Sequence, residues 1–440
     1  MYENLKILIL GAAKSGIAVA KLLSGKNNKI ILSDIKKLDD KVTHELENLG
    51  IKVVIGNQLE LIDSSYDLII KNPAILYTSD LMKKCRKLHL RVENEMEVAY
   101  HFLPNDITII GVTGSNGKTT TVTMIYDLLQ NMGKKVILGG NIGFPLASIV
   151  NEVKSGDILL LEISDHQLVD FNNFKTDISV LTNLCPTHLD YHGTYEHYKY
   201  TKKNIFNHHT KNELAIINAK NNDSLEITAG IDSTKIYFNN EHNYFTDEGI
   251  FIDDKLVLKK DDILLQGNHN YENILCCLLV IKRFCFDVEI IKEYFKKFGG
   301  VEHRLEYVTK INDVIFYNDS KATNPTATII ALKTFNKPIR LILGGMERNQ
   351  DFNELNDYLG KVIKIYAIGT VTDRIYNYAL DRKIECVKCY KLASAMKEIR
   401  QDMKSGEVVL LSTASSSQDQ YLRFEDRGAE FKNILQKWDK

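Results

Sequence analysis

The apolar positions of the chain form short continuous runs that alternate with longer stretches of helical spacing. The runs that predict β-strands are Leu5–Leu10, Lys29–Ser33, Asp67–Ile70, Ile107–Val112, Asp157–Leu161, Ile178–Thr182, Leu214–Asn218, Val314–Asn318, Ile339–Leu343, Ile363–Ile368 and Val408–Ser412. Most of these runs are continuous, whereas a strand with one solvated face alternates apolar and polar residues. Buried strands separated by helices are typical of βαβ units, so the pattern predicts a doubly wound α/β fold.

Two interruptions divide this pattern into parts. Pro104-Asn105-Asp106 follows the predicted helix Glu93–Leu103, and Gly299-Gly300 follows the predicted helix Asp287–Phe298. Residues 235–265 differ from their surroundings, because short β elements are joined there by charged turns, and we expect a small β-ribbon. The predicted parts are residues 1–93, 94–299 and 300–440.

Composition narrows the class of protein. The chain has 440 residues, a formal net charge of −1 and 44% hydrophobic residues, so we expect several buried cores and no large nucleic-acid surface. No apolar run reaches the roughly 18–20 residues of a membrane span, and Ile7–Leu10 is too short for a secretion signal. We therefore expect a cytoplasmic protein without membrane or nucleic-acid partners.

The seven cysteines agree with a reducing compartment. Their number is odd, and Cys276 and Cys277 lie inside an apolar run. Cys386 and Cys389 form a CxxC without a second pair, which leaves a zinc site as the alternative to two ordinary strand thiols.

The strongest local motif runs from Gly111 to Thr120, between a predicted strand and the predicted helix Thr121–Asn131. Glycines let a loop fold around phosphates, and the helix amino terminus presents positive dipole to them. Lys118 would reach the phosphates and Thr119 would bind Mg²⁺. Val112 stands where the common motif has its first glycine, so a plain glycine-rich turn remains an alternative.

Other polar residues follow predicted strands, where open α/β sheets bind ligands. Glu162 ends one such strand and is either a Mg²⁺ ligand or a solvated carboxylate. His188 is either a ligand or a loop residue, and Lys202 lies in a helical stretch where a solvated face is the simplest interpretation. In the amino-terminal part, the turn at residues 11–16 with Asp34 fits either a nucleotide-type ligand or a tight turn.

The carboxyl-terminal half carries further clusters of this kind. Asn270 and Asn273 flank the start of the predicted helix Ile274–Ile281, as caps or as ligand-binding amides. Polar clusters also surround the last strands, and each is either a binding loop or a turn with helix caps. These clusters are residues 303–306, 318–325, 344–348 and 412–419, with Phe424 and Arg427 after the last.

Taken in order along the whole chain, these motifs resemble the Mur ligase family, the ATP-dependent amide-forming enzymes of peptidoglycan precursor synthesis. The matching segments are TGSNGKTT at 113–120, GGNIG at 139–143, LLEIS at 160–164, HLDYHGT at 188–194, HNYEN at 269–273, EHR at 302–304, NDSKATN at 318–324, LGG with Arg348, and FEDRG at 424–428. NDSKATN and HLDYHGT most resemble the members that add D-glutamate to UDP-N-acetylmuramoyl-L-alanine.

The resemblance implies three domains and a reaction through an acyl phosphate. The expected domains are a Rossmann-like domain that binds the UDP substrate, a central P-loop ATPase-type domain with a parallel sheet and the β-ribbon, and a Rossmann-like carboxyl-terminal domain that binds the amino acid. ATP would phosphorylate the L-alanyl carboxylate, and the D-glutamate amine would attack the product. The implied cofactors are ATP and two Mg²⁺ ions, and we expect a monomer that closes its domains around its small-molecule substrates.

Roles carry over by matching positions. The residues implied at ATP are Gly114, Ser115, Asn116, Gly117, Lys118, Thr119, Thr120, Asn270, Asn273, Arg304 and Asp319. The implied metal ligands are Thr119, Glu162, His188 and a carbamylated Lys202. The residues implied at the substrates are Ser15, Asp34, Lys36, Asn141, Thr323, Arg348, Ser417 and Phe424. The implied catalytic residues are Lys118, His188, Lys202 and Lys321.

Some positions depart from the family pattern. The family usually has glycine at Ala13 and Ala74, and often an acidic residue at Thr187. Asp165-His166 replaces the more usual Ser-Phe. Two alternatives therefore stay open: a related ligase with another amino acid and another carboxylate, of folate or lipid-linked type, and a nucleotide-binding scaffold without catalysis. The NDSKATN loop speaks against the folate type, and the complete polar set speaks against the scaffold.

Overall fold

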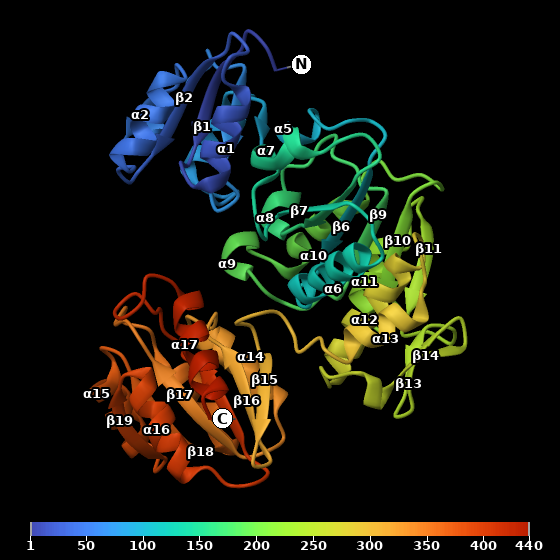
Figure 1. Ribbon diagram of the computed structural model, residues 1–440. Coiled ribbons are helices and arrows are strands. Elements are labelled where there is room, and N and C mark those ends of the chain that lie inside the picture. The colour runs from blue at the N-terminus through green and yellow to red at the C-terminus, as the bar shows by residue number, and fades with distance from the viewer. Residues whose placement is uncertain (1, 439–440) are drawn as a thin grey trace. The chain divides into compact units, whose positions relative to one another are not determined.

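The computed structural model describes residues 2–438, and the chain divides into two compact units (Figure 1). The first unit comprises the residues up to Ile263 together with Asn268–Tyr294. The second comprises Leu264–Gly267 and the chain from Phe295 onward. Each of the three parts predicted from the sequence contains one main sheet, and the predicted boundaries at 93/94 and 299/300 stay predictions.

The first sheet of unit 1 is parallel, with the order β3-β2-β1-β4-β5. Its strands are β1 Lys6–Leu10, β2 Lys29–Asp34, β3 Lys52–Ile55, β4 Leu68–Lys71 and β5 Val92–Glu93. The accompanying helices are α1 Lys14–Leu23, α2 Asp40–Asn48, α3 Gln58–Leu61, α4 Asp80–Lys87 and α5 Glu95–Tyr100. The order changes direction beside β1, and a crevice at such a point is where this fold class binds ligands.

The second sheet of unit 1 is also parallel, with the order β11-β10-β9-β6-β8-β7. Its strands are β6 Thr108–Thr113, β7 Val136–Gly140, β8 Ile158–Glu162, β9 Ile178–Leu181, β10 Leu214–Asn218 and β11 Thr234–Phe238. Because β9 and β8 pair with β6 on either side, the loops after these three strands meet at one edge of the sheet.

Helices and a separate ribbon complete unit 1. The helices are α6 Lys118–Asn131, α7 Leu146–Ile149, η1 Val150–Glu152, α8 Asp165–Leu168, α9 Leu189–His192, α10 Tyr195–Lys203, η2 Asn204–Phe206, α11 Asn222–Thr228, η3 Lys260–Asp262, α12 Asn268–Ile281 and α13 Val288–Phe295. The antiparallel ribbon consists of β12 Tyr244–Phe245, β13 Gly249–Ile252 and β14 Lys255–Lys259. The predicted ribbon began too early, because Thr234–Phe238 pairs with β10 as the parallel edge strand of the main sheet.

Unit 2 is built on one mixed sheet with the order β15-β16-β20-β17-β18-β19, in which β15 alone is antiparallel to its neighbour. Its strands are β15 Glu306–Ile311, β16 Val314–Asp319, β17 Ile339–Gly344, β18 Val362–Ile368, β19 Glu385–Tyr390 and β20 Val408–Ser412. Its helices are α14 Pro325–Thr334, η4 Phe352–Lys361, α15 Thr372–Asp381, α16 Leu392–Asp402 and α17 Phe424–Gln436.

Both faces of the unit 2 sheet are covered. Leu341 and Leu343 of β17 belong to one apolar cluster, whereas Ile342 between them belongs to the other. Cys386 and Cys389 of β19 are divided between the same two clusters. The two thiols therefore lie on opposite faces, which excludes the CxxC zinc site.

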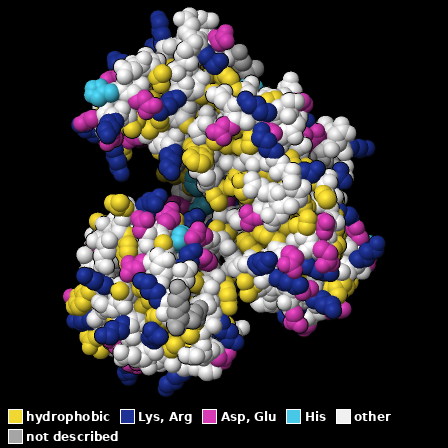
Figure 2. Space-filling model, viewed as in Figure 1, with side chains coloured by type: hydrophobic (Ala, Val, Ile, Leu, Met, Phe, Trp, Pro, Cys, Tyr) yellow, Lys and Arg dark blue, Asp and Glu magenta, His cyan; other side chains and the backbone are white. Residues whose placement is uncertain are grey.

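Two surface properties bear on the expected partners. Acidic and basic side chains are interspersed over the face drawn in Figure 2, without a broad patch of one sign. Among the described residues, no helix combines the length and the apolar character needed to span a membrane.

Candidate active site

The glycine-rich loop after β6 leads directly into α6, as predicted. Gly117 is the residue before the helix and has a φ of +83°, and Gly114 has a φ of +144°. A Cβ atom on Gly117 would lie 2.1 Å from Oδ1 of Asn273, and one on Gly114 would lie 2.0 Å from Oγ1 of Thr182. Both the backbone conformation and the space therefore require glycine at these two positions.

The end of β9 holds the loop from one side. The backbone N–H of Ser115 donates to the carbonyl of Asn183 over 2.8 Å, and that of Asn116 donates to the Asn183 side chain over 3.0 Å. The Thr182 hydroxyl donates to the carbonyl of Asn116 over 2.6 Å. Thr182 and Asn183 thus fix the loop, a role that the sequence analysis missed although Thr182 ends a predicted strand and Asn183 follows it.

Lys118 lies over the loop that precedes it. Its Nζ donates to the carbonyl oxygens of Gly114, at 2.6 Å, and Ser115, at 3.0 Å. The loop geometry and this amine place positive potential where a phosphate chain would lie at the start of α6. The role of Lys118 at a phosphate stays a prediction.

The loop is joined to β8 through Glu162. This carboxylate is buried, and it accepts hydrogen bonds of 2.7 Å from the Thr119 hydroxyl and from the Asn141 amide. A hydroxyl and a carboxylate are the oxygen ligands that Mg²⁺ prefers, so the two side chains fit that ion. The alternative of a solvated strand-end carboxylate is wrong, because only 3% of Glu162 is exposed.

A cluster of imidazoles surrounds Asp165, the first residue of α8. Its Oδ2 lies 3.0 Å from Nδ1 of His188, 2.8 Å from Nε2 of His192 and 3.2 Å from Nδ1 of His166. Burial alone would raise the pKa of Asp165, but the three histidines and Lys202 outweigh it and hold that pKa well below its usual range. Asp165, His166 and His188 form the one group with metal-ligand spacing among residues 2–438.

Lys202 is fully buried on α10, so its interpretation as part of a solvated face is wrong. Its Nζ donates to Oγ1 of Thr113 over 3.0 Å and lies 3.4 Å from Oδ1 of Asp165. Burial, followed by the positive charge of Lys118, lowers the pKa of Lys202 to about 7, although Asp165 opposes this change. His188 and Lys202 therefore both contact the Asp165 carboxylate, each at a different oxygen.

Asn270 and Asn273 lie inside α12, because this helix begins at Asn268. They do not cap a helix that starts at Ile274, as the sequence had suggested. Asn273 is buried beside Gly117, and its Oδ1 accepts a hydrogen bond of 3.4 Å from the Thr121 hydroxyl. Asn270 is also buried, one turn earlier on the same helix.

Ser15, Asp34 and Lys36 form a second group, at the carboxyl ends of β1 and β2. The Asp34 carboxylate accepts from the backbone N–H of Ala12, at 2.7 Å, and of Lys36, at 2.9 Å. The Ser15 hydroxyl accepts from the Asn72 amide over 3.3 Å. Asp34 therefore shapes the turn itself, and Lys36 is exposed beside it.

In unit 2, Asp319 ends β16 and is buried. Its carboxylate accepts from the Ser412 hydroxyl, at 2.7 Å, and from the backbone N–H of Leu305, at 3.1 Å. Burial raises the pKa of Asp319 to about 7 against these two hydrogen bonds. The neighbouring Arg304 and Lys321 belong to the segments before β15 and after β16.

The loops after β16, β20 and β17 come together because these strands are neighbours. Arg427 of α17 ties two of the loops: its guanidinium donates to the hydroxyl and the carbonyl of Ser320, each at 2.9 Å, and to the carbonyl of Ser415 at 3.3 Å. Ser320 also donates to the carbonyl of Phe424 over 2.8 Å. The predicted residues Thr323, Arg348 and Ser417 lie on these loops, and Phe424 is the first residue of α17.

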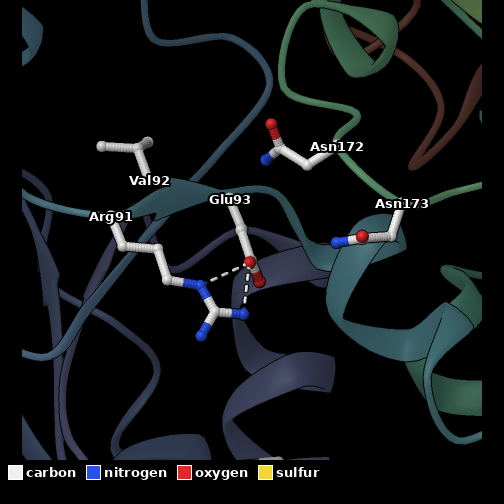
Figure 3. A pocket seen from close by; sticks show the side chains of 5 residues that line it. All are labelled: Arg91, Val92, Glu93, Asn172 and Asn173. Atoms are coloured by element: carbon white, nitrogen blue, oxygen red, sulfur yellow. Dashed lines mark hydrogen bonds and ion pairs between the residues drawn. The ribbon is translucent and has the colours of Figure 1, made fainter.

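One cavity of unit 1 contains none of the predicted site residues. It has a volume of about 480 Å³ and is lined by Arg91, Val92, Glu93, Asn172 and Asn173 (Figure 3). Its two charged groups pair with each other, since Nε of Arg91 donates to the Glu93 carboxylate over 2.7 Å. This pairing gives no reason to place a phosphate there.

The loop, Lys118 and the Thr119–Glu162 pair define a nucleotide-binding protein of the P-loop class. Comparison with known proteins identifies the family. Family models described as the Mur ligase middle domain and the Mur ligase glutamate ligase domain match residues 112–281 and 303–415. The chain belongs to the Mur ligase family.

Curated relatives match nearly the whole chain. UDP-N-acetylmuramoylalanine–D-glutamate ligase of Geobacillus kaustophilus is 39% identical over 99% of this chain and 98% of its own. The protein of that name from Streptococcus thermophilus is 38% identical over 98% and 96%. Among solved structures, UDP-N-acetylmuramate-alanine ligase from Thermotoga maritima shares the fold, with a TM-score of 0.57, 18% identity and coverage of 99% of this chain and 100% of that chain.

Proposed function

We propose that this chain is an ATP-dependent ligase that adds D-glutamate to UDP-N-acetylmuramoyl-L-alanine. The observation that carries the proposal is the 39% identity over nearly the full length to a curated ligase of that name. The phosphate loop with Lys118, Thr119 and Glu162 supports the use of ATP, because these groups form one connected set.

The chemistry explains why such an enzyme needs a phosphate loop. A carboxylate is a poor electrophile, so its oxygen first attacks the γ-phosphorus of ATP, and ADP leaves. The amine of D-glutamate then attacks the acyl carbon, and the tetrahedral intermediate gives up the amine proton to solvent and expels phosphate as the amide forms. Both steps build up negative charge, which Lys118 and the loop amides are suited to stabilise.

Thr119 and Glu162 are the residues that would hold Mg²⁺ near the phosphates. When bound there, the ion would neutralise phosphate charge. Asn141 would then lie close to the reacting carboxylate, since its amide already contacts Glu162. Asn273, which packs against Gly117, and Asn270 are proposed for adenosine, together with Arg304 and Asp319.

A second Mg²⁺ would need an anionic ligand beside His188. A carbamate on Lys202 is one prediction for that ligand, and a pKa of about 7 favours the uncharged amine that adds CO₂. Asp165 is a second candidate, because its carboxylate already contacts both His188 and Lys202. Either group would complete a site for a divalent cation.

The remaining assignments stay proposals. Ser15, Asp34 and Lys36 would contact the UDP group on the first sheet. Thr323, Arg348, Ser417 and Phe424 would bind D-glutamate, with Lys321 as a catalytic residue of the same loop cluster. The three-domain division and a monomeric state belong to the same proposal, as does a cytoplasmic location.

Transfer of labelled oxygen tests the proposed reaction. We would prepare UDP-N-acetylmuramoyl-L-alanine with ¹⁸O in both oxygens of the alanyl carboxylate and analyse the phosphate released in the presence of ATP and D-glutamate. One ¹⁸O should appear in each phosphate, and one should remain in the amide. Unlabelled phosphate, with ¹⁸O-water as the reciprocal control, would contradict an acyl phosphate.

A further inference from the structure

Asp165 and His166 are among the residues that depart from the expected family pattern, and both side chains lie in the imidazole cluster. His166 packs against Tyr191 with ring centroids 3.9 Å apart and against His188 with centroids 5.0 Å apart. Asp165, His166 and His188 each have one possible ligand atom that lies within 4.8 Å of those of the other two. Two successive residues of α8 thus bring a carboxylate and an imidazole to His188.

The two oxygens of Asp165 have different partners. Oδ1 lies 3.4 Å from Nζ of Lys202, and Oδ2 lies 3.0 Å from Nδ1 of His188. The carboxylate therefore lies between the lysine amine and the imidazole. This is the position that a carbamate on Lys202 would need in order to reach a cation beside His188.

Further contacts fix the orientation of this carboxylate. His192 is buried, and its Nε2 approaches Oδ2 of Asp165 to 2.8 Å. Its Nδ1 lies 2.9 Å from Nδ1 of His197, so the imidazole is held from both sides. Partners of this kind, behind a ligand, set the direction of its lone pairs toward a metal.

We propose that Asp165, His166 and His188 form a divalent-cation site of this chain, in which the Asp165 carboxylate takes the place of a carbamate and Lys202 stays an unmodified amine. The inference rests on the proposed function and specifies one part of it, the anionic ligand of the second cation. It replaces a modification that depends on CO₂ by a permanent side chain.

The contacts of Lys202 and the charge of Asp165 both favour this assignment. Lys202 is fully buried, and its amine is already engaged by Thr113 and Asp165. A carbamate would add a second anion beside the Asp165 carboxylate, and like charges at this separation repel strongly in a buried site. One carboxylate and two imidazoles are a ligand set found at Zn²⁺ and non-haem Fe²⁺ sites, and Mn²⁺ is a paramagnetic divalent probe for such a site.

Binding of Mn²⁺ to the full-length protein tests the cation site. The binding is measured without nucleotide, from the electron paramagnetic resonance signal of the free ion. Asp165→Asn keeps the shape of the side chain and should lower the affinity at least about 10-fold. His166→Phe keeps the ring packing and removes one nitrogen, and it should also weaken binding. The matched control is Asp254→Asn, which alters an exposed pair with His242 at 2.8 Å and should leave binding unchanged.

¹³C-bicarbonate with nuclear magnetic resonance tests the state of Lys202. The spectrum of the unaltered protein should contain no carbamate signal beyond those that Lys202→Ala also shows. In Asp165→Asn, by contrast, added bicarbonate or acetate should restore part of the Mn²⁺ binding. A carbamate signal of Lys202 in the unaltered protein, or undiminished Mn²⁺ binding in both Asp165→Asn and His166→Phe, would overturn the proposal.

The result for the cation site can be distinguished from the result for the proposed function. Neither readout requires turnover, and the D-glutamate reaction is measured on the unaltered protein alone. A protein that binds Mn²⁺ through Asp165 but does not incorporate D-glutamate would refute the substrate assignment and leave the cation site standing.

Discussion

The hydroxyl of Thr119 donates a hydrogen bond of 2.7 Å to the carboxylate of Glu162, across 43 positions of the sequence. This contact joins the first turn of α6 to the end of β8. It exists because β6 and β8 are neighbours in the parallel sheet, so the residues after β6 and at the end of β8 share one edge. The proposed Mg²⁺ ligands are thus already side by side.

Replacement of Glu162 by glutamine should remove the charge of this pair while keeping its size. We expect kcat/KM for ATP to fall about 100-fold or more and the Mg²⁺ requirement to rise, because a neutral amide is a weaker ligand for a hard cation. Phosphate release as a function of Mg²⁺ concentration measures both effects. Unchanged turnover at the Mg²⁺ concentration that saturates the unaltered enzyme would contradict the assignment.

Lys118→Ala should abolish the reaction. The amine lies over the carbonyls of Gly114 and Ser115, and its loss removes the positive charge nearest to the proposed phosphates. We expect phosphate release to fall about 1,000-fold, as with other groups that stabilise transition-state charge. Lys135→Ala, which changes a lysine paired with Asp157 near the start of β8, serves as the control. Normal phosphate release by Lys118→Ala would exclude the lysine from phosphate binding.

Gly117→Ala and Gly133→Ala, compared with each other, separate an effect on the shape of the phosphate loop from an effect on stability. Gly133, just after α6, has a similar φ of +73° but open space around its Cα, whereas a Cβ on Gly117 would meet Asn273. Both substitutions should cost about 1–2 kcal/mol through the left-handed backbone. Only Gly117→Ala should also lose nucleotide affinity, as measured by calorimetric titration with ADP. Equal ADP affinity of the two variants would mean that the loop does not bind phosphate.

Arg348→Ala tests the amino-acid assignment in unit 2. The guanidinium reaches the side chain of Gln418 in the loop after β20, and we expect it to pair with a carboxylate of D-glutamate. The KM for D-glutamate should rise at least about 10-fold while the KM for ATP changes little. Arg382→Ala, at a half-buried arginine bonded to Asn353 and Asn356, is the control. Equal increases in both KM values would contradict this placement.

Glu95 predicts a pH dependence of stability. Burial raises its pKa to about 7, although the backbone N–H of Ala147 opposes the rise. The folded protein then retains a proton that the unfolded chain loses near pH 4.5, so this group lowers stability as the pH rises from about 4.5 to 7. The loss amounts to about 3 kcal/mol for a shift of this size.

Glu95→Gln should therefore flatten this part of the stability profile and make the protein more stable than the unaltered chain above pH 7. Urea unfolding at pH 5, 6, 7 and 8 measures the effect, with Glu152→Gln at an exposed position as the control. A variant whose stability declines with pH as steeply as that of the unaltered protein would show that Glu95 is not the responsible group.

The sequence predicted the central strands because continuous apolar runs need cover on both faces. Every strand predicted from such a run is present, with shifts of one residue at some ends. The strands that were missed lie at sheet edges or are short. β19, with the sequence ECVKCY, and β15, with EYVTKI, mix charged and apolar residues, since an edge strand is partly exposed to water.

The part of the site that lies at the ends of strands could be predicted from the sequence. Lys118, Thr119 and Glu162 follow neighbouring strands, so the rule for parallel sheets brings them together. The role of Asp165 was not predictable in this way. Its partners His188 and Lys202 lie 23 and 37 positions later, on elements whose packing no local pattern fixes.

Phosphate release from ATP with UDP-N-acetylmuramoyl-L-alanine, with and without D-glutamate, tests the central claim most directly. L-glutamate and D-alanine are the matched controls. We expect release that requires D-glutamate, together with a product heavier than the substrate by one glutamyl residue. Release that is equal with all three amino acids or absent with all of them, in a preparation that binds ATP, would contradict the account.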